Sequence, residues 1–588
     1  MSSVHVVATA GHVDHGKSTL VHALTGIDPD RFGEEKARGL TIDLGFAWAT
    51  LPSGRGLAFI DVPGHVRFIK NMLAGVGAVD ACLFVVAATE GWKPQSEEHL
   101  RILELLGITH GLVALTKVSV VDDDHRELAH MDVADHLAGT FLEEAEVIDV
   151  DAPTGRGLDE LRAGLDRLLA TTPTAVDRGR PRLWVDRSFA AKGSGTVVTG
   201  TLTGGRLAVD DELSLLPSAR TVRVRALQSH QESLAELGPG RRTAVNLVGA
   251  GHDDVERGDA LVRLGQWHLT RRLDASLAVL ASLDHEVSRR GAYVAYLGSG
   301  EWPVRLRVLG GSALLPGDAG LVRLHLDQTL PLVPGDRFVL RETGRAETVG
   351  GGEVLDVDPV VPASRARPDR SVARVVAERG WVEAEVLERL TGVTQQATIG
   401  PWVAGPAALA NTRAAVEEAV DGAGPLGLDV AALGPRERAV LATLDDVEVE
   451  AGRARRPDAV DPLAGHPYLT ALEKDPFTPP LPEGVDRGEL RELVRRDLVL
   501  ESEGTWFAPS AVSEAGQHLA DLLADHPEGL TVAQIRDALG TSRKFLLPLL
   551  ALLDKRGMTR RRGDLRIRGP RLPAADEPPL DRSLASDS

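Results

Sequence analysis

The sequence predicts a multidomain fold made of an α/β domain, two β-barrels and a C-terminal winged-helix (α+β) arm. Three successive patterns lead to this prediction. Short apolar strands first alternate with amphipathic helices, then short strands are separated by glycine and Asp-Asp turns, and a helical pattern follows. The predicted parts are the α/β domain 1–172, the barrels 180–266 and 267–360, the arm 368–570 and a disordered tail 571–588.

The α/β domain should contain a doubly wound sheet. An apolar strand precedes each helical pattern, and five such strands are expected: Val4–Ala8, Leu57–Asp61, Cys82–Ala88, Gly111–Thr116 and Glu146–Val150. Residues 171–181 are rich in Thr, Pro and Arg, which is typical of a linker. In the first barrel, valines alternate with arginines over residues 221–225, so the valines should face the core.

Composition and sequence signals exclude several classes of protein. The chain has 588 residues, a net charge of −19 and one cysteine, Cys82, which cannot form an intrachain disulfide and lies in an apolar run typical of a buried strand. The N-terminus lacks a secretory signal, and no apolar run reaches the ~18 residues that span a bilayer. We therefore expect a cytoplasmic monomer with no membrane partner.

A phosphate-binding loop is predicted at residues 11–18. The segment Gly11-His12-Val13-Asp14-His15-Gly16-Lys17-Ser18 fits the pattern G-x-x-x-x-G-K-[ST] between a strand and a helix. The glycines allow backbone N–H groups to surround phosphates, Lys17 neutralises the β and γ oxygens, and Ser18 offers a hydroxyl to Mg²⁺. We predict that these eight residues and Thr19 contact a nucleotide.

Two further segments complete a predicted nucleotide switch. Asp61 ends the next apolar strand, where a carboxylate can hold Mg²⁺ through water, and Gly64 lets a backbone N–H reach the γ-phosphate. Thr41 lies between the two motifs and can offer a second hydroxyl to the metal when the γ-phosphate is present. The predicted metal-binding residues are therefore Ser18, Thr41 and Asp61.

These motifs resemble those of translational GTPases of the elongation factor Tu kind. The resemblance rests on the phosphate loop, on residues 38–41 (Arg-Gly-Leu-Thr) and on residues 61–65 (Asp-Val-Pro-Gly-His). It implies a P-loop GTPase domain with GTP or GDP and Mg²⁺ as cofactors. It also makes His65 the catalytic residue that positions the attacking water, with Val13 and Leu40 as an apolar gate. The alternative for His65 is an ordinary histidine in a surface loop.

The loops that read guanine in that family differ in this chain. The family has Asn-Lys-x-Asp in one loop and Ser-Ala in the other, whereas this chain has Thr116-Lys117-Val118-Ser119 and Asp151-Ala152. Ser119 cannot form the charge-assisted pair with the base, which is worth about 1.5–3 kcal/mol. Either Asp151 supplies the missing carboxylate from the second loop, or guanine binding has weakened. Both interpretations stay open.

Three features resemble the selenocysteine-specific elongation factors in particular. The first is residues 30–36 together with 39–46, and the second is residues 186–187, 192–202 and 242–247 in the first barrel. The third is the extension of about 200 residues beyond Asp358. The resemblance implies selenocysteinyl-tRNA, a messenger RNA hairpin and the ribosome as partners. It also implies that Asp186, Arg187 and Arg242 line a cationic aminoacyl pocket, which would favour an ionised selenol over a neutral hydroxyl. The alternative is that these charges lie on exposed barrel faces.

The end of the arm has the clearest helical pattern. A winged helix is predicted there by two helical stripes of apolar residues followed by a hairpin around Gly563-Asp564. The first stripe is residues 532, 535 and 539, and the second is residues 546, 549, 550 and 553. Gly488–Phe507 looks like a second copy. Between Arg543 and Arg568 there are nine basic and two acidic residues. We predict an RNA-binding face, with a solvated basic face or a protein contact as alternatives, formed by Arg543, Lys544, Arg560, Arg561, Arg562 and Arg566.

Taken together, the residues and the resemblance predict GTP-dependent delivery of selenocysteinyl-tRNA to the ribosome at recoded UGA codons. The arm would bind a messenger hairpin, and the ribosome would trigger GTP hydrolysis. Two alternatives remain. One is a general or initiation-type tRNA-delivery GTPase, and the other is an RNA-binding relative with altered nucleotide specificity or no turnover.

Overall fold

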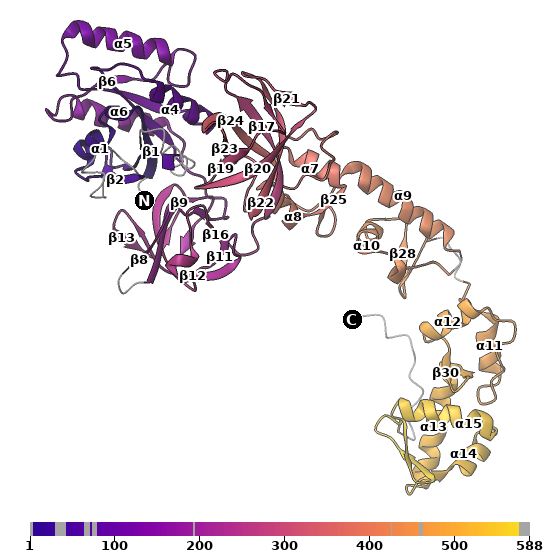
Figure 1. Ribbon diagram of the computed structural model, residues 1–588. Helices are drawn as coiled ribbons and strands as arrows, with labels where there is room; N and C mark the ends of the chain where they lie inside the picture. Colours follow the sequence, from indigo (N-terminus) through magenta and orange to yellow (C-terminus); the bar gives the residue numbers. More distant parts are fainter. Residues whose placement is uncertain are drawn as a thin grey trace. The chain divides into compact units, whose positions relative to one another are not determined.

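The computed structural model describes residues 4–29, 43–63, 71–72, 79–191, 195–424, 426–457 and 462–574 (Figure 1). The chain forms two compact units, Met1–Gly405 and Pro406–Ser588. The first unit contains the α/β domain, both barrels and one winged-helix unit. The second contains the rest of the predicted arm. The predicted fold class is confirmed.

The α/β domain is built on a six-stranded sheet of order β2-β3-β1-β4-β5-β6. Its strands are β1 (Val4–Ala10), β2 (Gly45–Thr50), β3 (Gly56–Asp61), β4 (Ala81–Ala87), β5 (Gly111–Thr116) and β6 (Val147–Asp149). All five predicted strands are present. The sequence analysis did not predict β2, which pairs antiparallel with β3 at the edge of the sheet. Cys82 is fully buried in β4, as expected, and burial raises the pKa of its thiol to about 12.

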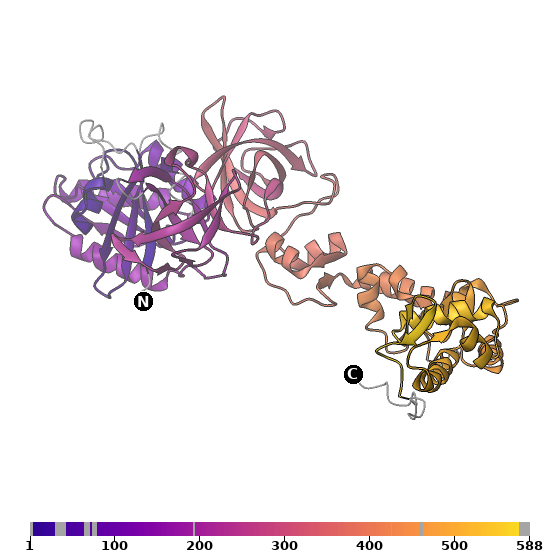
Figure 2. The same cartoon turned by 90° about the horizontal axis from the view of Figure 1, so that it is seen from below.

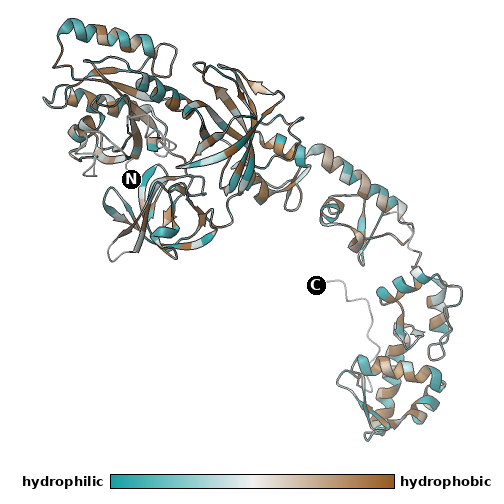
Figure 3. Ribbon diagram, viewed as in Figure 1, coloured by the Kyte–Doolittle hydropathy of each residue, from teal (hydrophilic) through white to brown (hydrophobic). Residues whose placement is uncertain are grey.

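In the described part of the domain, four helices cover the two faces of this sheet: α1 (Lys17–Thr25), α4 (Pro94–Leu105), α5 (Asp123–Leu137) and α6 (Leu158–Thr171). Apolar residues of α1 and α6 share one core, and those of α4 and α5 share the other. Helix α5 buries only Ala129, Val133 and Leu137, and the rest of it is largely hydrophilic (Figure 3). Among the described residues, no helix combines the length and the apolar character that crossing a lipid bilayer requires.

Each barrel is a closed ring of six main strands (Figures 1 and 2). The first ring follows the order β11 (Glu212–Leu216), β16 (Ala260–Arg263), β7 (Arg182–Trp184), β9 (Gly195–Thr203), β15 (Arg241–Val248) and β12 (Arg220–Ser229). The second follows β17 (Thr270–Val279), β22 (Ala319–Leu330), β20 (Gly300–Leu309), β19 (Tyr293–Leu297), β23 (Arg337–Glu342) and β24 (Glu347–Asp356). As predicted, Val222 and Val224 are buried, whereas Arg223 and Arg225 are exposed.

Shorter elements complete the barrels. Strand β8 (Arg187–Ala191) pairs with β9, and two small sheets form from β10 (Leu207–Ala208) with β14 (Glu236–Leu237) and from β18 (Val287–Ser288) with β21 (Ala313–Leu314). The others are β13 (Glu232–Leu234) and the short 3-10 helix η2 (His252–Asp254). Strand β8 is the one that matters most for function, because it begins at Arg187 beside the candidate aminoacyl pocket.

The first winged-helix unit packs on the second barrel. It consists of α7 (Val372–Arg379), β25 (Trp381–Glu383), α8 (Ala384–Thr391) and β26 (Trp402–Ala404). Buried side chains of α7, β25 and α8 belong to the same apolar core as the second barrel. The sequence analysis grouped this unit with the rest of the arm. The structure instead places it in the first compact unit, because its apolar faces are covered by the barrel.

The second compact unit contains three further helical units with small sheets. The first has α9 (Pro406–Gly422), β27 (Leu428–Asp429), the 3-10 helix η3 (Val430–Ala432), α10 (Pro435–Leu441), β28 (Glu448–Glu450) and β29 (Arg453–Arg455). The next has α11 (Pro467–Lys474), α12 (Arg487–Arg495), β30 (Leu500–Ser502) and β31 (Thr505–Phe507). The last has α13 (Pro509–Asp525), β32 (Leu530–Thr531), α14 (Val532–Ala538), α15 (Arg543–Lys555), β33 (Thr559–Arg562) and β34 (Leu565–Arg568).

The last unit has the predicted arrangement of helix, turn, helix and hairpin. The predicted leucines of α15 are fully buried, and Gly557, at φ 74°, follows the end of the helix. Ser542 is the residue that precedes α15, but its side chain makes no capping hydrogen bond. Most of the predicted disordered tail, residues 575–588, lies outside the described residues.

A buried carboxylate joins two winged-helix units. Glu492 of α12 is 2% exposed, and its oxygens accept hydrogen bonds from Arg495 at 2.5 Å, Arg496 at 3.0 Å and Arg453 of β29 at 3.3 Å. Burial alone would raise the pKa of Glu492. The hydrogen bonds from Arg495 and Arg496 and the charge of Arg453 outweigh burial and lower this pKa to about 2. Glu492 is therefore ionised and fully paired at neutral pH.

Replacing Glu492 by Gln should destabilise the second compact unit at neutral pH. Because the folded pKa lies below the usual 4.5, the ionised carboxylate contributes about 3 kcal/mol above pH ~4.5, and this contribution is lost as the pH falls toward 2. Urea unfolding followed through Trp506, the single tryptophan of residues 406–588, measures the effect. Exposed Glu483→Gln is the control. Equal stability of the Glu492 and Glu483 variants at pH 7 would contradict the account.

Candidate functional site

The predicted phosphate loop connects β1 to α1 in a conformation that requires glycine at two positions. Gly11 has φ 129°, and a Cβ atom there would lie 2.1 Å from the backbone oxygen of Val85. Gly16 has φ 85° and immediately precedes α1. The loop therefore ends at a helix N-terminus, where free backbone N–H groups and the helix dipole favour a phosphate.

Three predicted site residues converge below this loop. The Lys17 ammonium donates to the backbone oxygens of Gly11 at 3.0 Å and His12 at 2.8 Å. The Ser18 hydroxyl donates to Asp61 Oδ2 at 2.6 Å. The structure thus brings together the lysine, the hydroxyl and the carboxylate that the motifs predicted, although Ser18 and Asp61 are separated by 43 residues in the sequence.

Thr9 is a site residue that the sequence analysis missed. Its hydroxyl donates to Asp61 Oδ1 at 2.6 Å and accepts from the Val62 backbone N–H at 3.1 Å. Thr9 therefore fixes the orientation of the carboxylate proposed to hold a metal, as second-layer partners do in metal sites. The available signal was a buried hydroxyl residue within the otherwise apolar end of β1.

Buried histidines support the loop. His99 of α4, also missed by the sequence analysis, accepts a hydrogen bond from the Gly11 backbone N–H on Nδ1 at 3.1 Å. Burial lowers the pKa of His99 to about 3 and that of His15 to about 4. Both rings are therefore neutral near pH 7, so they hold the loop backbone without adding charge next to the Lys17 ammonium.

Several predicted residues lie outside the described residues: Leu40, Thr41, Gly64, His65 and residues 192–194. Of the predicted apolar gate, Val13 is described, and its backbone N–H donates to Gln95 Oε1 at 3.2 Å. The role of His65 as the residue that positions water remains a prediction.

The two loops predicted to read the base leave the same edge of the sheet, because β5 and β6 are neighbouring parallel strands with Leu115 in register with Asp149. The Thr116 hydroxyl, at the end of β5, donates to the His15 backbone oxygen at 2.7 Å. Lys117 follows with φ 59° and pairs with Glu90 at 3.2 Å. The first base loop is therefore tied to the phosphate loop.

Ser119 and Asp151 differ in burial. Ser119 is exposed, whereas Asp151 is 4% exposed, and half-buried Ala152 follows it. Asp151 Oδ2 accepts a hydrogen bond from the Thr154 hydroxyl at 2.6 Å. No described Lys, Arg or His forms an ion pair with this carboxylate. Asp151 therefore keeps acceptor capacity that its protein neighbours do not use.

The charges predicted to form the aminoacyl pocket are not on exposed barrel faces. Asp186 is 3% exposed and forms a two-bond ion pair with Arg242, one bond being Arg242 Nη2 to Asp186 Oδ1 at 2.8 Å. The guanidiniums of Arg242 and Arg187 lie over the Phe46 ring of β2, 4.0 and 4.8 Å from its centroid. Arg187 also pairs with Asp43 at 3.2 Å. The three predicted charges therefore lie at the seam between the first barrel and the α/β domain.

Arg257 ties this pocket to the α/β domain, and the sequence analysis missed it. Its Nε donates to the Asp186 backbone oxygen at 2.9 Å, Nη1 to Asn71 Oδ1 at 2.7 Å and Nη2 to Asp43 Oδ1 at 2.7 Å. Asp43 and Asn71 follow the two predicted switch segments in the sequence. One guanidinium therefore contacts the pocket and the residues next to both segments.

The predicted RNA-binding residues differ in solvent exposure. Arg543, Lys544, Arg560, Arg561 and Arg562 are exposed. Arg566 is only 11% exposed and pairs with Asp554 at 3.2 Å. The exposed charges thus lie at the start of α15 and along β33, and Arg566 faces a carboxylate.

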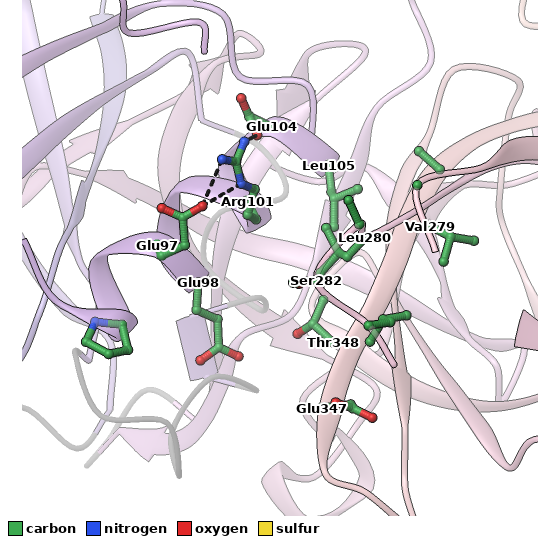
Figure 4. A pocket seen from close by; sticks show the side chains of 15 residues that line it. Glu97, Glu98, Arg101, Glu104, Leu105, Val279, Leu280, Ser282, Glu347 and Thr348 are labelled. Carbon is green, nitrogen blue, oxygen red and sulfur yellow. Dashed lines mark hydrogen bonds and ion pairs between the residues drawn. The ribbon is translucent and has the colours of Figure 1, made fainter. Parts of the chain in front are cut away.

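A cavity of about 860 Å³ lies between α4 and the second barrel (Figure 4). Its α4 side presents Glu97 and Glu104, both paired with Arg101, and Glu98, which reaches Arg341 at 3.4 Å. The barrel side is largely apolar and includes Val279 and Leu280 (Figure 4). None of the predicted site residues lines this cavity, so the candidate nucleotide site is separate from it.

Family models match four segments of the chain. They are Elongation factor Tu GTP binding domain over residues 2–171, Elongation factor Tu domain 2 over 195–262, Selenocysteine-specific elongation factor, beta-barrel domain over 272–361, and Elongation factor SelB, winged helix over 521–568. With the fold and the phosphate loop described above, these matches define a translational GTPase.

Known proteins narrow this class. The chain is 31% identical over 622 residues to the selenocysteine-specific elongation factor of Escherichia coli (strain K12), covering 95% of this chain and 98% of that protein. The match to the factor of Desulfomicrobium baculatum is 42% identical over 353 residues but spans only 55% of that protein's length. A crystal structure of a bacterial selenocysteine-specific elongation factor, EF-Sec, aligns with a TM-score of 0.71 and 27% identity over 97% of this chain and 100% of that one. The chain belongs to the selenocysteine-specific elongation factor family.

Proposed function

We propose that this protein delivers selenocysteinyl-tRNA to the ribosome at recoded UGA codons in its GTP-bound form. The observation that carries the proposal is the cluster formed by buried Asp186 and the half-buried Arg187 and Arg242 at the seam between barrel and α/β domain. The relative from Escherichia coli, which aligns over nearly the full length of both chains, is a selenocysteine-specific elongation factor, and this supports the same function. The proposed partners are the tRNA, a messenger hairpin and the ribosome.

The chemistry of the pocket suits a selenol. A selenol is mostly ionised at neutral pH, whereas the serine hydroxyl is neutral, so a guanidinium favours the selenolate. Asp186 accepts two hydrogen bonds from one edge of the Arg242 guanidinium and so fixes its orientation. Phe46 lies against both arginines. The three guanidiniums of Arg187, Arg242 and Arg257 face the two carboxylates of Asp43 and Asp186, so this group keeps one positive charge that can attract an anion.

The residues of the phosphate loop fit GTP or GDP with Mg²⁺. In this proposal Lys17 contacts the β and γ oxygens, while Ser18, Asp61 and Thr41 hold the metal, with Thr9 orienting Asp61. Mg²⁺, when bound, neutralises phosphate charge. His65 positions the attacking water, and the ribosome triggers hydrolysis. The convergence of Ser18 and Asp61 within 2.6 Å supports this arrangement.

Replacing Arg242 by Gln should weaken selenocysteinyl-tRNA binding by about 10–100-fold, the value of one charge-assisted contact, with little effect on seryl-tRNA. The matched control is Gln at Arg241, the preceding residue of β15. Filter binding with GTP and one tRNA body measures both affinities. Equal losses for the two aminoacyl groups would show that Arg242 does not read the selenol.

For nucleotide choice, we propose that Asp151 replaces the carboxylate missing at Ser119 and accepts hydrogen bonds from guanine. Its burial, its lack of a described cation partner and the shared sheet edge support this exchange. The competing proposal is weakened guanine binding, which the exposed Ser119 hydroxyl supports.

Two Asp151 variants separate these proposals. Asp151→Ala should weaken GTP binding by about 10–100-fold through loss of a charge-assisted pair. Asp151→Asn should move the preference toward XTP, because the amide can donate to the xanthine 2-oxygen that replaces the guanine amino group. Fluorescent-nucleotide competition with GTP, ATP and XTP measures both effects. Unchanged GTP affinity in Asp151→Ala would rule out the exchange.

We further propose that the basic residues of the last winged-helix unit bind the messenger hairpin. Replacing both Arg560 and Arg561 by alanine should weaken hairpin binding. It should also reduce the slope of log affinity against log salt concentration by about the amount that two phosphate contacts contribute. Alanine at Arg487 and Arg491 removes two exposed arginines from α12 and is the matched control. A salt slope that is unchanged, or that falls equally in both variants, would argue against a specific hairpin site.

A further inference from the structure

A second cavity lies where several parts of the first compact unit meet, and we refer to it as the junction cavity. It measures about 370 Å³ and lies apart from the phosphate loop and the barrel pocket. Its walls come from the linker after α6, the ends of strands in the first barrel, the connection between the barrels, residues 333–336 of the second barrel, and Arg370 and Gly392 near the first winged-helix unit.

The lining of the junction cavity is strongly cationic. Four guanidiniums line it, and Asp336 is the one carboxylate among its lining residues. Arg182 forms a two-bond ion pair with Asp336 at 2.6 and 2.7 Å, and Arg370 pairs with Glu353 at 2.7 Å. The other two, Arg178 and Arg180, have no carboxylate partner among the described residues. The lining therefore carries two positive charges that its own ion pairs do not neutralise.

Arg180 is unusual because it is buried and forms no ion pair in the described part of the chain, although the carboxylates of Glu388 and Asp336 act on it from beyond ion-pair distance. It is 6% exposed, and its guanidinium donates only to backbone oxygens, those of Gln266 at 2.7 Å, Glu388 at 2.9 Å and Arg389 at 3.5 Å. It also lies over the Trp267 ring, 4.7 Å from the centroid. Burying a charge without a counter-charge costs several kcal/mol. An anion in the junction cavity would offset this cost.

Hydrogen-bond donors in the same lining also lack acceptors. The Nε atoms of Arg180 and Arg182 and the indole nitrogen of Trp267 are buried and have no hydrogen-bond partner in the part of the chain that the structure describes. Buried donors without acceptors are uncommon in folded proteins and call for a specific explanation. The surplus of donors agrees with the surplus of positive charge, since both call for a ligand rich in oxygen acceptors.

We propose that the junction cavity is a phosphate-binding pocket. Inorganic phosphate or a phosphate monoester has three or four acceptor oxygens and a charge near −2, and a backbone phosphodiester has two non-bridging oxygens and one negative charge. The planar guanidinium matches the geometry of both. The volume of about 370 Å³ is within the range of small-ligand pockets, so it admits more than one phosphate group. The phosphate can come from a free phosphorylated anion or from an RNA backbone, because the chemistry of recognition is the same for both.

Tryptophan fluorescence of the full-length protein tests the proposal, with GDP and Mg²⁺ in excess so that the phosphate loop is occupied. Inorganic phosphate, pyrophosphate and an RNA duplex of roughly 20 base pairs are titrated separately. We expect a saturable signal that Trp267→Phe removes. Arg178→Gln with Arg370→Gln should weaken binding at least tenfold. The control, Arg305→Gln with Arg307→Gln, removes two exposed charges from β20 and should leave the binding affinity unchanged.

The outcomes separate the sources and can overturn the proposal. Saturable pyrophosphate binding that the duplex does not displace identifies a free anion. Duplex binding that depends on Arg178 and Arg370, and that displaces pyrophosphate, identifies an RNA backbone. Absence of saturable binding by all three probes would overturn the proposal. Equal weakening in the two double variants would do so too, because it would show general electrostatic attraction.

Discussion

The contact between the α/β domain and the first barrel centres on one guanidinium, that of Arg257. Its three nitrogen positions are occupied by Asp43 and Asn71 of the α/β domain and by the backbone of Asp186 in the barrel. Asp43 follows residues 30–42 and Asn71 follows residues 64–70, the segments that hold the predicted Thr41 and His65. The carboxylate of Asp186 in turn orients Arg242. A short chain of charge-assisted hydrogen bonds thus connects Asp43 and Asn71, which follow the predicted switch segments, to the proposed aminoacyl pocket.

Buried charge follows a consistent pattern in this protein. Pairs such as Arg323 with Asp274, Arg182 with Asp336 and the arginines around Glu492 are closed, because each buried charge has a well-placed partner. Asp151 and Arg180 are exceptions, since each is buried without a described partner of opposite charge. Burying an unpaired charge is costly. At both positions, a bound ligand would lower this cost.

The sequence predicted what local patterns determine. The phosphate loop, five strands and the last winged helix follow from motif spacing and apolar periodicity, and the structure contains them. The sequence could not predict contacts between residues that are far apart along the chain. His99 reaches Gly11 across 88 residues, and Arg257 reaches Asp43 across 214, and neither has a local signal. The first winged-helix unit resembles the others in sequence pattern, and only packing on the second barrel shows that it belongs with the first compact unit.

The most direct test of the account is the affinity of the unmodified protein for selenocysteinyl-tRNA and seryl-tRNA on one tRNA body, measured by filter binding with GTP and with GDP. The account predicts that the GTP form prefers selenocysteinyl-tRNA by about 10-fold or more, the value of at least one charge-assisted contact. It also predicts that GDP removes most of this binding, because Arg257 links the proposed pocket to Asp43 and Asn71, the residues that follow the predicted switch segments. Equal affinity for the two aminoacyl-tRNAs with GTP would contradict it.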